Sequence, residues 1–215
     1  MVKSTLRGIR RAHGAPQRRA KPLTKEDLFS VLAATGNGLK DVRDRALLLI
    51  GFAGAFRRSE LVAISCTDIE PVKQGVVIHI RRSKTDQEGA GREIGIPHGR
   101  TRWCPVTALN EWLERAEIEE GPIFRSVDRH GRMQGQRLSS EAVSLVIKER
   151  VAVVGLDPDK FSGHSLRAGL ATSAAAAGVS SWQIRQQTGH ASDAMLARYI
   201  RDGELFVDNA AGALL

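Results

Sequence analysis

The segment from Asp41 to Gly54 is the feature that most limits how this chain can fold. After Arg45 it contains only Ala, Leu, Ile, Gly and Phe, a pattern typical of a helix that is apolar on most of its surface. Such a helix is stable in water only when other elements cover it on most sides. We therefore expect a buried helix here, with the rest of the core packed around it.

Three further helices are expected along the chain. The first begins after Thr24, which can cap it with Asp27 three positions later, and it ends by residues 36–38. The second covers residues 105–118 and the third covers residues 139–154. Each has an apolar face and a polar face, so each is expected to pack one side against the core.

Two short runs rich in β-branched residues lie between the helices. Val76–Ile80 and Glu93–Ile96 flank a polar, glycine-containing loop and predict a β-hairpin. Residues 125–137 are rich in arginine and glycine, and we expect them to form a polar, positively charged loop that faces DNA. The predicted fold class is therefore mainly α with a small antiparallel β-hairpin or sheet (α+β).

Size and composition exclude several classes of protein. The chain has 215 residues, of which 42% are hydrophobic, enough for a globular core. Its longest apolar run, residues 46–56, is too short to cross a membrane, and the N-terminus has no apolar segment typical of a secretion signal. Cys66 and Cys104 lie far apart without a CxxC spacing, so we expect two reduced, structural thiols and neither a disulfide nor a zinc site.

The net charge of +8 is concentrated at the N-terminus. Residues 1–25 contain eight Lys and Arg and no acidic residue, so the remaining 24 basic and 24 acidic residues cancel. We expect residues 1–22 to be a basic arm or interdomain linker that follows DNA phosphates, with a disordered solubilising tail as the alternative. The body of the protein would then be residues 23–202.

The stretch from His164 to Tyr199 contains the residue types that phosphoryl transfer needs. His164 and Arg167 are three positions apart and would share one face of a helix. His190 follows a helix stop at Thr188-Gly189, and the only tyrosine, Tyr199, comes nine residues later. Arginine provides a permanent charge, histidine titrates near neutrality and tyrosine is a nucleophile. Taken alone, each histidine is more often a satisfied core or surface residue.

This order of residues resembles the catalytic domain of the tyrosine recombinase, or phage integrase, family. That family has His-x-x-Arg, then Gly-His, then a tyrosine about nine residues later. Residues 55–61 (AFRRSEL) are similar to its first arginine motif, and residues 83–86 (SKTD) are similar to its hairpin lysine. The resemblance covers roughly residues 22–201 and implies the tyrosine recombinase catalytic-domain fold, with no metal and no cofactor.

The resemblance also implies a role for each site residue. The catalytic set would be Arg57, Lys84, His164, Arg167, His190 and Tyr199, supported by Glu60. The two arginines would neutralise the non-bridging oxygens of the phosphate, and Lys84 would protonate the 5′ oxygen that leaves. Tyr199 would attack, with His164 as proton acceptor, while His190 would bind a non-bridging oxygen. The expected DNA contacts are Arg81, Arg82, Arg129 and Arg132.

Taken alone, Arg57 and Glu60 are more often a surface ion pair, and the downstream motifs in the right order reverse this preference. Ala55 and Arg58 depart from the family pattern, which more often has glycine and an apolar residue there. This departure leaves the chemistry intact but changes packing around Arg57.

The function that the resemblance implies is site-specific recombination of double-stranded DNA through a 3′-phosphotyrosyl intermediate, in the cytoplasm at the nucleoid. The protein would be a monomer without DNA and a homotetramer on paired sites. Two alternatives stay open: DNA relaxation like that of a type IB topoisomerase, and a non-catalytic DNA-binding module.

Both ends of the chain raise a question about assembly. The family's N-terminal core-binding domain is missing, so we expect either an excised catalytic fragment or a naturally short recombinase. Residues 203–215 are too apolar for a free tail and are expected to pack either on their own domain or in a neighbouring protomer.

Overall fold

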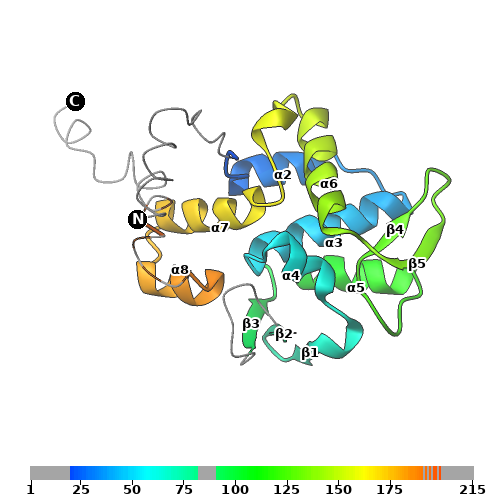
Figure 1. Ribbon diagram of the computed structural model, residues 1–215, viewed down its shortest axis with the longest axis horizontal. Coiled ribbons are helices and arrows are strands. Elements are labelled where there is room, and N and C mark those ends of the chain that lie inside the picture. The colour runs from blue at the N-terminus through cyan, green and yellow to red at the C-terminus, as the bar shows by residue number, and fades with distance from the viewer. Residues whose placement is uncertain are drawn as a thin grey trace, which may run out of the picture.

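The computed structural model describes residues 20–81 and 91–190, together with Ser192, Ala194, Leu196, Ala197 and Tyr199. The predicted arm of residues 1–22 and tail of residues 203–215 therefore lie almost entirely outside the described residues. Within the described part, the fold is mostly helical with two small antiparallel sheets (Figure 1), which confirms the predicted α+β class.

Seven α-helices and five strands are described. The helices are α2 (Lys25–Ala33), α3 (Leu39–Ala53), α4 (Arg58–Ala63), α5 (Pro105–Arg115), α6 (Ser140–Val153), α7 (Ser165–Ala176) and α8 (Ser181–Thr188). The strands are β1 (Ile69–Val72), β2 (Gly75–Ile80), β3 (Arg92–Pro97), β4 (Arg125–Val127) and β5 (Met133–Arg137). None of the helices in the described part of the chain is long and apolar enough to cross a membrane.

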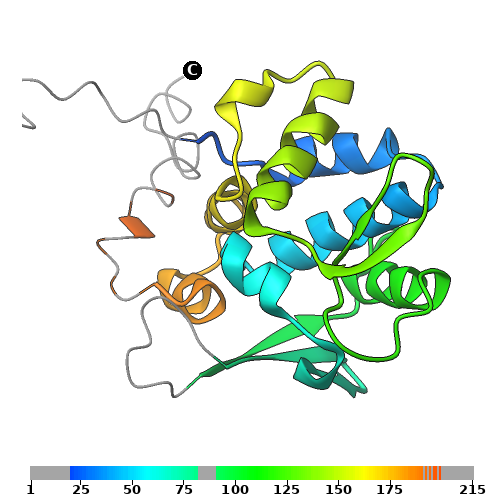
Figure 2. The same cartoon turned by 45° about the vertical axis from the view of Figure 1, so that its right-hand side comes forward.

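Helix α3 is the central element, as its sequence predicts. It runs through the middle of the domain, between the other helices (Figures 1 and 2), and it contacts α4, α5 and α7. Residues 42–44 and 46–51 are all buried, so every side of the helix is covered over this length. The Thr24 and Ser139 hydroxyls cap α2 and α6 by accepting hydrogen bonds from the backbone of Asp27 and Ala142.

The same helix also buries charged residues that its apolar pattern does not predict. Asp44 is fully buried and accepts hydrogen bonds from Arg43 and from Arg150 of α6, each at 2.6 Å. Arg150 also pairs with Asp41 at 2.7 Å. Burial alone would lower the pKa of Arg150, but the Asp44 and Asp41 carboxylates raise it above its usual value. This network joins α3 to α6, and removing either charge would leave its partner buried and unpaired.

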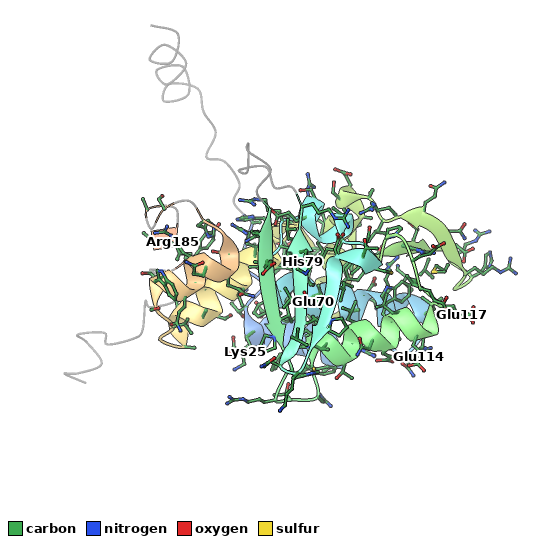
Figure 3. The ribbon with its side chains drawn as sticks, turned by 90° about the horizontal axis from the view of Figure 1, so that it is seen from below. Lys25, Glu70, His79, Glu114, Glu117 and Arg185 are labelled. Carbon is green, nitrogen blue, oxygen red and sulfur yellow. The ribbon has the colours of Figure 1, made fainter. Side chains whose placement is uncertain are left out.

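The larger sheet has the strand order β1-β2-β3 and is antiparallel throughout. The predicted hairpin is confirmed as β2 and β3, in which Ile78 pairs with Ile94. Its connecting loop, with Arg82 and Lys84, lies outside the described residues. On the sheet face turned away from the helices, His79 pairs with Glu70 at 3.1 Å (Figure 3).

The prediction of a loop at residues 125–137 is wrong, because this segment is a β-hairpin. Arg125 pairs with Arg137, and Val127 pairs with Met133. The turn is stabilised by the Asp128 carboxylate, which accepts hydrogen bonds from the backbone N–H groups at positions 130 and 132. A strand with polar residues on both faces has no alternating pattern, so the sequence did not indicate it.

Candidate active site

The candidate site forms where α4, α7, α8 and β3 meet. Arg57 directly precedes α4, His164 and Arg167 lie in the first turn of α7, and His190 follows the end of α8. Tyr199 is in a helical conformation beyond α8. Figure 2 shows the start of α7 beside α4, and α8 below it. The structure thus brings together five of the six residues assigned to catalysis, and Lys84 lies outside the described part.

Arg57 is oriented by Glu60, one helical turn later. The Glu60 carboxylate accepts a hydrogen bond from the Arg57 backbone N–H at 3.0 Å and from its Nη1 at 2.5 Å. Burial would raise the pKa of Glu60, but the Arg57 backbone N–H and the charges of Arg92 and Arg57 together lower it. Glu60 is therefore a buried, ionised carboxylate that fixes the direction of an arginine at the edge of the site.

Arg92 is a third arginine of the cluster, and the sequence analysis missed it. It opens β3, and its Nη2 donates to Glu60 at 3.0 Å. Its Nη1 lies 3.5 Å from the Gln187 carbonyl oxygen at the end of α8. Nε of Arg92 is buried and has no hydrogen-bond partner among the described residues. The only available signal was an arginine at the start of a predicted strand, which by itself is typical of a solvated surface.

The end of α8 is shaped to receive this arginine. Gly189 ends the helix with φ 61°, a left-handed conformation that favours glycine. A Cβ atom at Gly189 would lie 2.4 Å from Nη1 of Arg92, so any larger residue would displace the guanidinium. The Gln187 side chain donates to the Ala53 carbonyl at 2.7 Å, which fixes α8 to the end of α3.

Arg167 is the most deeply buried arginine of the cluster. It is 2% exposed, and its Nη1 donates to the Ala55 carbonyl at 2.9 Å. Ala55 has φ 48°, a conformation that favours glycine, so the departure from the family's usual glycine has a backbone cost. Burial first, and then the charge of Arg57, lowers the pKa of Arg167 to about 10, so it remains charged at neutral pH.

His164 and Tyr199 are in direct contact. Nε2 of His164 lies 2.6 Å from the Tyr199 hydroxyl oxygen, and the two ring centroids are 6.1 Å apart. The pKa of His164 is lowered by lost hydration and by the charges of Arg167 and Arg57. At neutral pH the imidazole is therefore uncharged and able to accept the phenolic proton.

His190 lies near the same tyrosine. Its ring centroid is 5.8 Å from that of Tyr199, and its Nδ1 is 2.7 Å from the Thr188 hydroxyl oxygen. Burial, followed by the charges of Arg167, His164, Arg57 and Arg92, lowers its pKa to about 4. Its side chain is consequently neutral in the unliganded protein.

The cluster as a whole is an anion-binding site with a nucleophile. Arg57 and Arg92 pair with one carboxylate, Glu60, and the charge of Arg167 lies close by, so positive charge is in excess beside the Tyr199 hydroxyl. A groove of about 570 Å³ opens next to it and is lined by Arg57, Arg58, Ser59, Ser140, Ser162, Gly163 and His164. In the described part of the chain, no group of three or more His, Cys, Asp or Glu is arranged to hold a metal ion.

The expected DNA contacts that lie in the described part of the chain do not join this cluster. Arg129 and Arg132 are exposed in the β4–β5 turn, at the opposite end of the domain from α8 (Figure 1). Arg81 pairs with Asp68 at 2.6 Å and its side chain is 70% exposed. Arg82 lies outside the described residues.

Comparisons with known proteins give the same family that the motifs suggest. The model of the phage integrase family matches residues 21–204. The chain is 43% identical over 212 residues to an integrase/recombinase xerD homolog of Selenomonas ruminantium, covering 98% of this chain and 62% of that protein. It is 27% identical over 233 residues to the recombinase cre of Escherichia phage P1, covering 100% of this chain and 65% of that protein.

Solved structures share the fold at low sequence identity. The XerH site-specific recombinase in a post-cleavage complex matches with a TM-score of 0.70 and 18% identity, covering 90% of this chain and 53% of that one. A lambda integrase dimer bound to a core site matches with a TM-score of 0.65 and 18% identity, covering 96% and 58%. The chain thus spans less than two thirds of the length of these relatives, and it belongs to the phage integrase family.

Proposed function

We propose that this chain is the catalytic part of a site-specific DNA recombinase that cleaves and rejoins strands through a 3′-phosphotyrosyl intermediate. One observation supports the proposal above all others: the Tyr199 hydroxyl lies 2.6 Å from Nε2 of His164 and next to the arginine cluster. A nucleophile, its proton acceptor and a positively charged pocket are the parts that attack on a phosphodiester needs. The relatives are named as recombinases and integrases, which supports the same reaction.

The proposed reaction is a transesterification. His164 takes the proton of Tyr199, and the phenolate oxygen forms a bond to phosphorus while the bond from phosphorus to the 5′ oxygen breaks. Lys84 gives the leaving 5′ oxygen its proton. Arg57 and Arg167 neutralise the charge that grows on the non-bridging oxygens, which is work that metal ions do in other phosphoryl-transfer enzymes.

The reverse step completes the exchange. A 5′-hydroxyl from another strand attacks the phosphotyrosyl bond, and the proton transfers run backwards through Lys84 and His164. The bond formed is of the same type as the bond broken, so no external energy source is required.

A nicked suicide DNA substrate tests the proposal. Cleavage next to the nick releases a short strand, so the covalent adduct cannot be resealed and appears as a shifted band on a denaturing gel. We expect the adduct to form equally with and without EDTA. Absence of adduct on any sequence of a randomised substrate library would favour the non-catalytic DNA-binding module instead.

A second assay separates recombination from relaxation. A plasmid with two marked sites should give recombinant products as well as covalent adduct. Relaxation of supercoiled plasmid without exchange would identify the activity of a type IB topoisomerase. The relatives named as recombinases favour exchange.

We further propose that the protein acts on double-stranded DNA at the nucleoid, as a monomer in solution and a homotetramer on paired sites. One solved relative is a lambda integrase tetramer on a Holliday junction. In this assembly the basic residues 1–22 would follow the DNA backbone, residues 23–202 would form the catalytic domain, and residues 203–215 would pack in the neighbouring protomer.

Deleting residues 204–215 should weaken assembly on paired sites more than binding to one half-site. A truncated monomer with lower thermal stability and normal assembly would instead place the tail on its own domain.

A further inference from the structure

The Thr188 hydroxyl lies between two hydrogen-bonding groups. Its Oγ1 is 2.7 Å from the Ile184 carbonyl oxygen and 2.7 Å from Nδ1 of His190. Thr188 is fully buried and His190 is only 9% exposed, so water does not compete for either contact. Both distances are those of short hydrogen bonds, and the direction of each can be worked out.

A threonine hydroxyl has one hydrogen, and this decides the arrangement. The Ile184 carbonyl oxygen can only accept. If the hydroxyl instead turned its hydrogen toward His190, two oxygens would face each other at 2.7 Å with no hydrogen between them. Thr188 therefore donates to Ile184, and its oxygen accepts from Nδ1–H of His190.

This direction determines which nitrogen of His190 holds the proton. The neutral imidazole has one N–H, so a proton on Nδ1 leaves Nε2 as a bare lone pair. Within the described part of the chain, Nε2 of His190 makes no hydrogen bond to the protein. A phosphate oxygen is also only an acceptor, so the neutral ring in this form cannot bind it.

The charges around His190 favour this neutral form until an anion arrives. Arg57 before α4, Arg92 of β3, Arg167 of α7 and the His164 ring all oppose protonation of His190. Glu60 is the one carboxylate of this cluster among the residues that the structure describes, and Arg57 and Arg92 already pair with it. A phosphate bound among the arginines favours protonation of His190, because its negative charge stabilises the imidazolium.

We propose that Thr188 is a positioning residue that keeps Nδ1 of His190 protonated. His190 then binds a phosphate oxygen only as an imidazolium, so anion binding is accompanied by the uptake of one proton at Nε2. The inference rests on the proposed function only in assigning that anion to DNA. For any oxyanion, the inference states that binding at this site is coupled to proton uptake by His190.

The tautomer of His190 in the free protein tests the first half of this proposal. In protein labelled with ¹⁵N-histidine, long-range ¹⁵N–¹H spectra at pH 7.5 distinguish Nδ1–H from Nε2–H, and the His190 signals are assigned by their loss in His190→Gln. We expect the Nδ1–H form in the wild type and in Thr188→Ser, which keeps the hydroxyl. Thr188→Val has the same shape without the hydroxyl and should shift the population toward Nε2–H. A wild-type ring in the Nε2–H form, or a Val variant with an unchanged ring, would overturn the proposal.

Titration with sulfate tests the second half. Sulfate is an oxyanion that does not itself titrate in this range, and chloride at equal ionic strength is the control. We expect sulfate to raise the His190 titration midpoint by about one pH unit or more in the wild type and Thr188→Ser, and by less than half of that in Thr188→Val. Equal shifts in all three proteins would refute the role of Thr188.

These spectra distinguish a failure of the Thr188 proposal from a failure of the recombinase proposal. They report the state of the His190 ring whether or not the protein cleaves DNA. A wild-type protein that forms no adduct but shows the expected tautomer and sulfate response refutes the recombinase and leaves the role of Thr188 standing. Circular dichroism of each variant verifies that it is folded.

Discussion

Nε2 of His164 lies 2.6 Å from the hydroxyl oxygen of Tyr199, although the two residues are 35 positions apart in the chain. The contact joins the first turn of α7 to the helical residues beyond α8. It places a neutral proton acceptor on the one phenol of the protein, beside the buried charge of Arg167. The predictions below follow from this contact and from the residues that surround it.

Replacing Tyr199 with Phe should abolish the covalent adduct and leave DNA affinity nearly unchanged. The substitution removes one hydroxyl and keeps the ring that lies near both histidines. Adduct is measured on a denaturing gel with the nicked substrate, and affinity by gel shift. Adduct that persists in this variant would identify another residue as the nucleophile.

The cleavage rate should depend on the protonation of His164. Its pKa is lowered from the usual value of 6.5, so the neutral, proton-accepting form is retained as the pH falls to that value. The second-order cleavage constant reports the free enzyme, and we expect it to be flat from pH 8 to about 6.5 and to fall below that range.

His164→Gln removes the proton acceptor and should slow cleavage by about 10²–10⁴-fold, with loss of this acid limb. His79→Gln is the matched control, since His79 lies on the outer face of the sheet against Glu70 (Figure 3). An unchanged acid limb in His164→Gln would contradict the assignment.

Glu60→Gln should lower both stability and activity. The variant keeps a hydrogen-bonding group but loses the negative charge that pairs with Arg57 and Arg92, so we expect a loss of about 2 kcal/mol in the free energy of unfolding. Since the pKa of Glu60 is lowered, the wild-type carboxylate stabilises the fold above pH 4.5, and this contribution disappears as the pH falls below that value.

Asp68→Asn provides a comparison for Glu60→Gln, because Asp68 is also a buried carboxylate that pairs with an arginine, Arg81. It should lower stability without changing the rate of the chemical step at saturating DNA. Denaturant unfolding and single-turnover cleavage measure the two effects. Equal losses of rate in both variants would mean that Glu60 acts only through stability.

Lys84→Ala should cause a large loss of cleavage rate that a modified substrate restores. When sulfur replaces the 5′ bridging oxygen, the leaving group needs no proton, so the missing general acid no longer matters. Rates are compared on the normal and the sulfur-containing substrate for the wild type and the variant. If the sulfur substrate is cleaved no faster by Lys84→Ala than the normal one, Lys84 is not the acid.

Gly189→Ala should disturb the site through Arg92. The added Cβ lies 2.4 Å from Nη1 of Arg92, on top of the cost of a left-handed alanine, which is about 1–2 kcal/mol. Gly178→Ala is the control, because Gly178 has φ 75° and open space where its Cβ would lie. We expect both variants to lose thermal stability and only Gly189→Ala to lose cleavage rate. Equal cleavage rates would show that the position of Arg92 has no influence on the reaction.

Much of the chain was predictable because the relevant forces act over a few residues. The buried helix α3 follows from an apolar run, and the caps of α2 and α6 follow from Thr24 and Ser139. The β2–β3 hairpin follows from β-branched residues. His164 and Arg167 lie near each other because residues three positions apart share one face of a helix, and such spacing is visible in any sequence.

Strand β1 and the β4–β5 hairpin were not predictable in the same way. Residues 69–72 form a strand only because β2 provides a hydrogen-bonding edge, with Ile69 opposite Ile78. Residues 125–137 are polar on both faces and are held by pairing and by the Asp128 turn. Pairing partners far along the chain determine such strands, and local propensity does not.

The sequence by itself determined the residue types, their order and the local helices that hold them. Only the tertiary structure decided that Arg92 from β3 shares Glu60 with Arg57, and that the Gln187 side chain of α8 donates to the Ala53 carbonyl at the end of α3. The physical reason is burial. A charge or a hydroxyl removed from water must find its partner within hydrogen-bond distance, and which partner that is depends on how α4, α8 and β3 pack against α3.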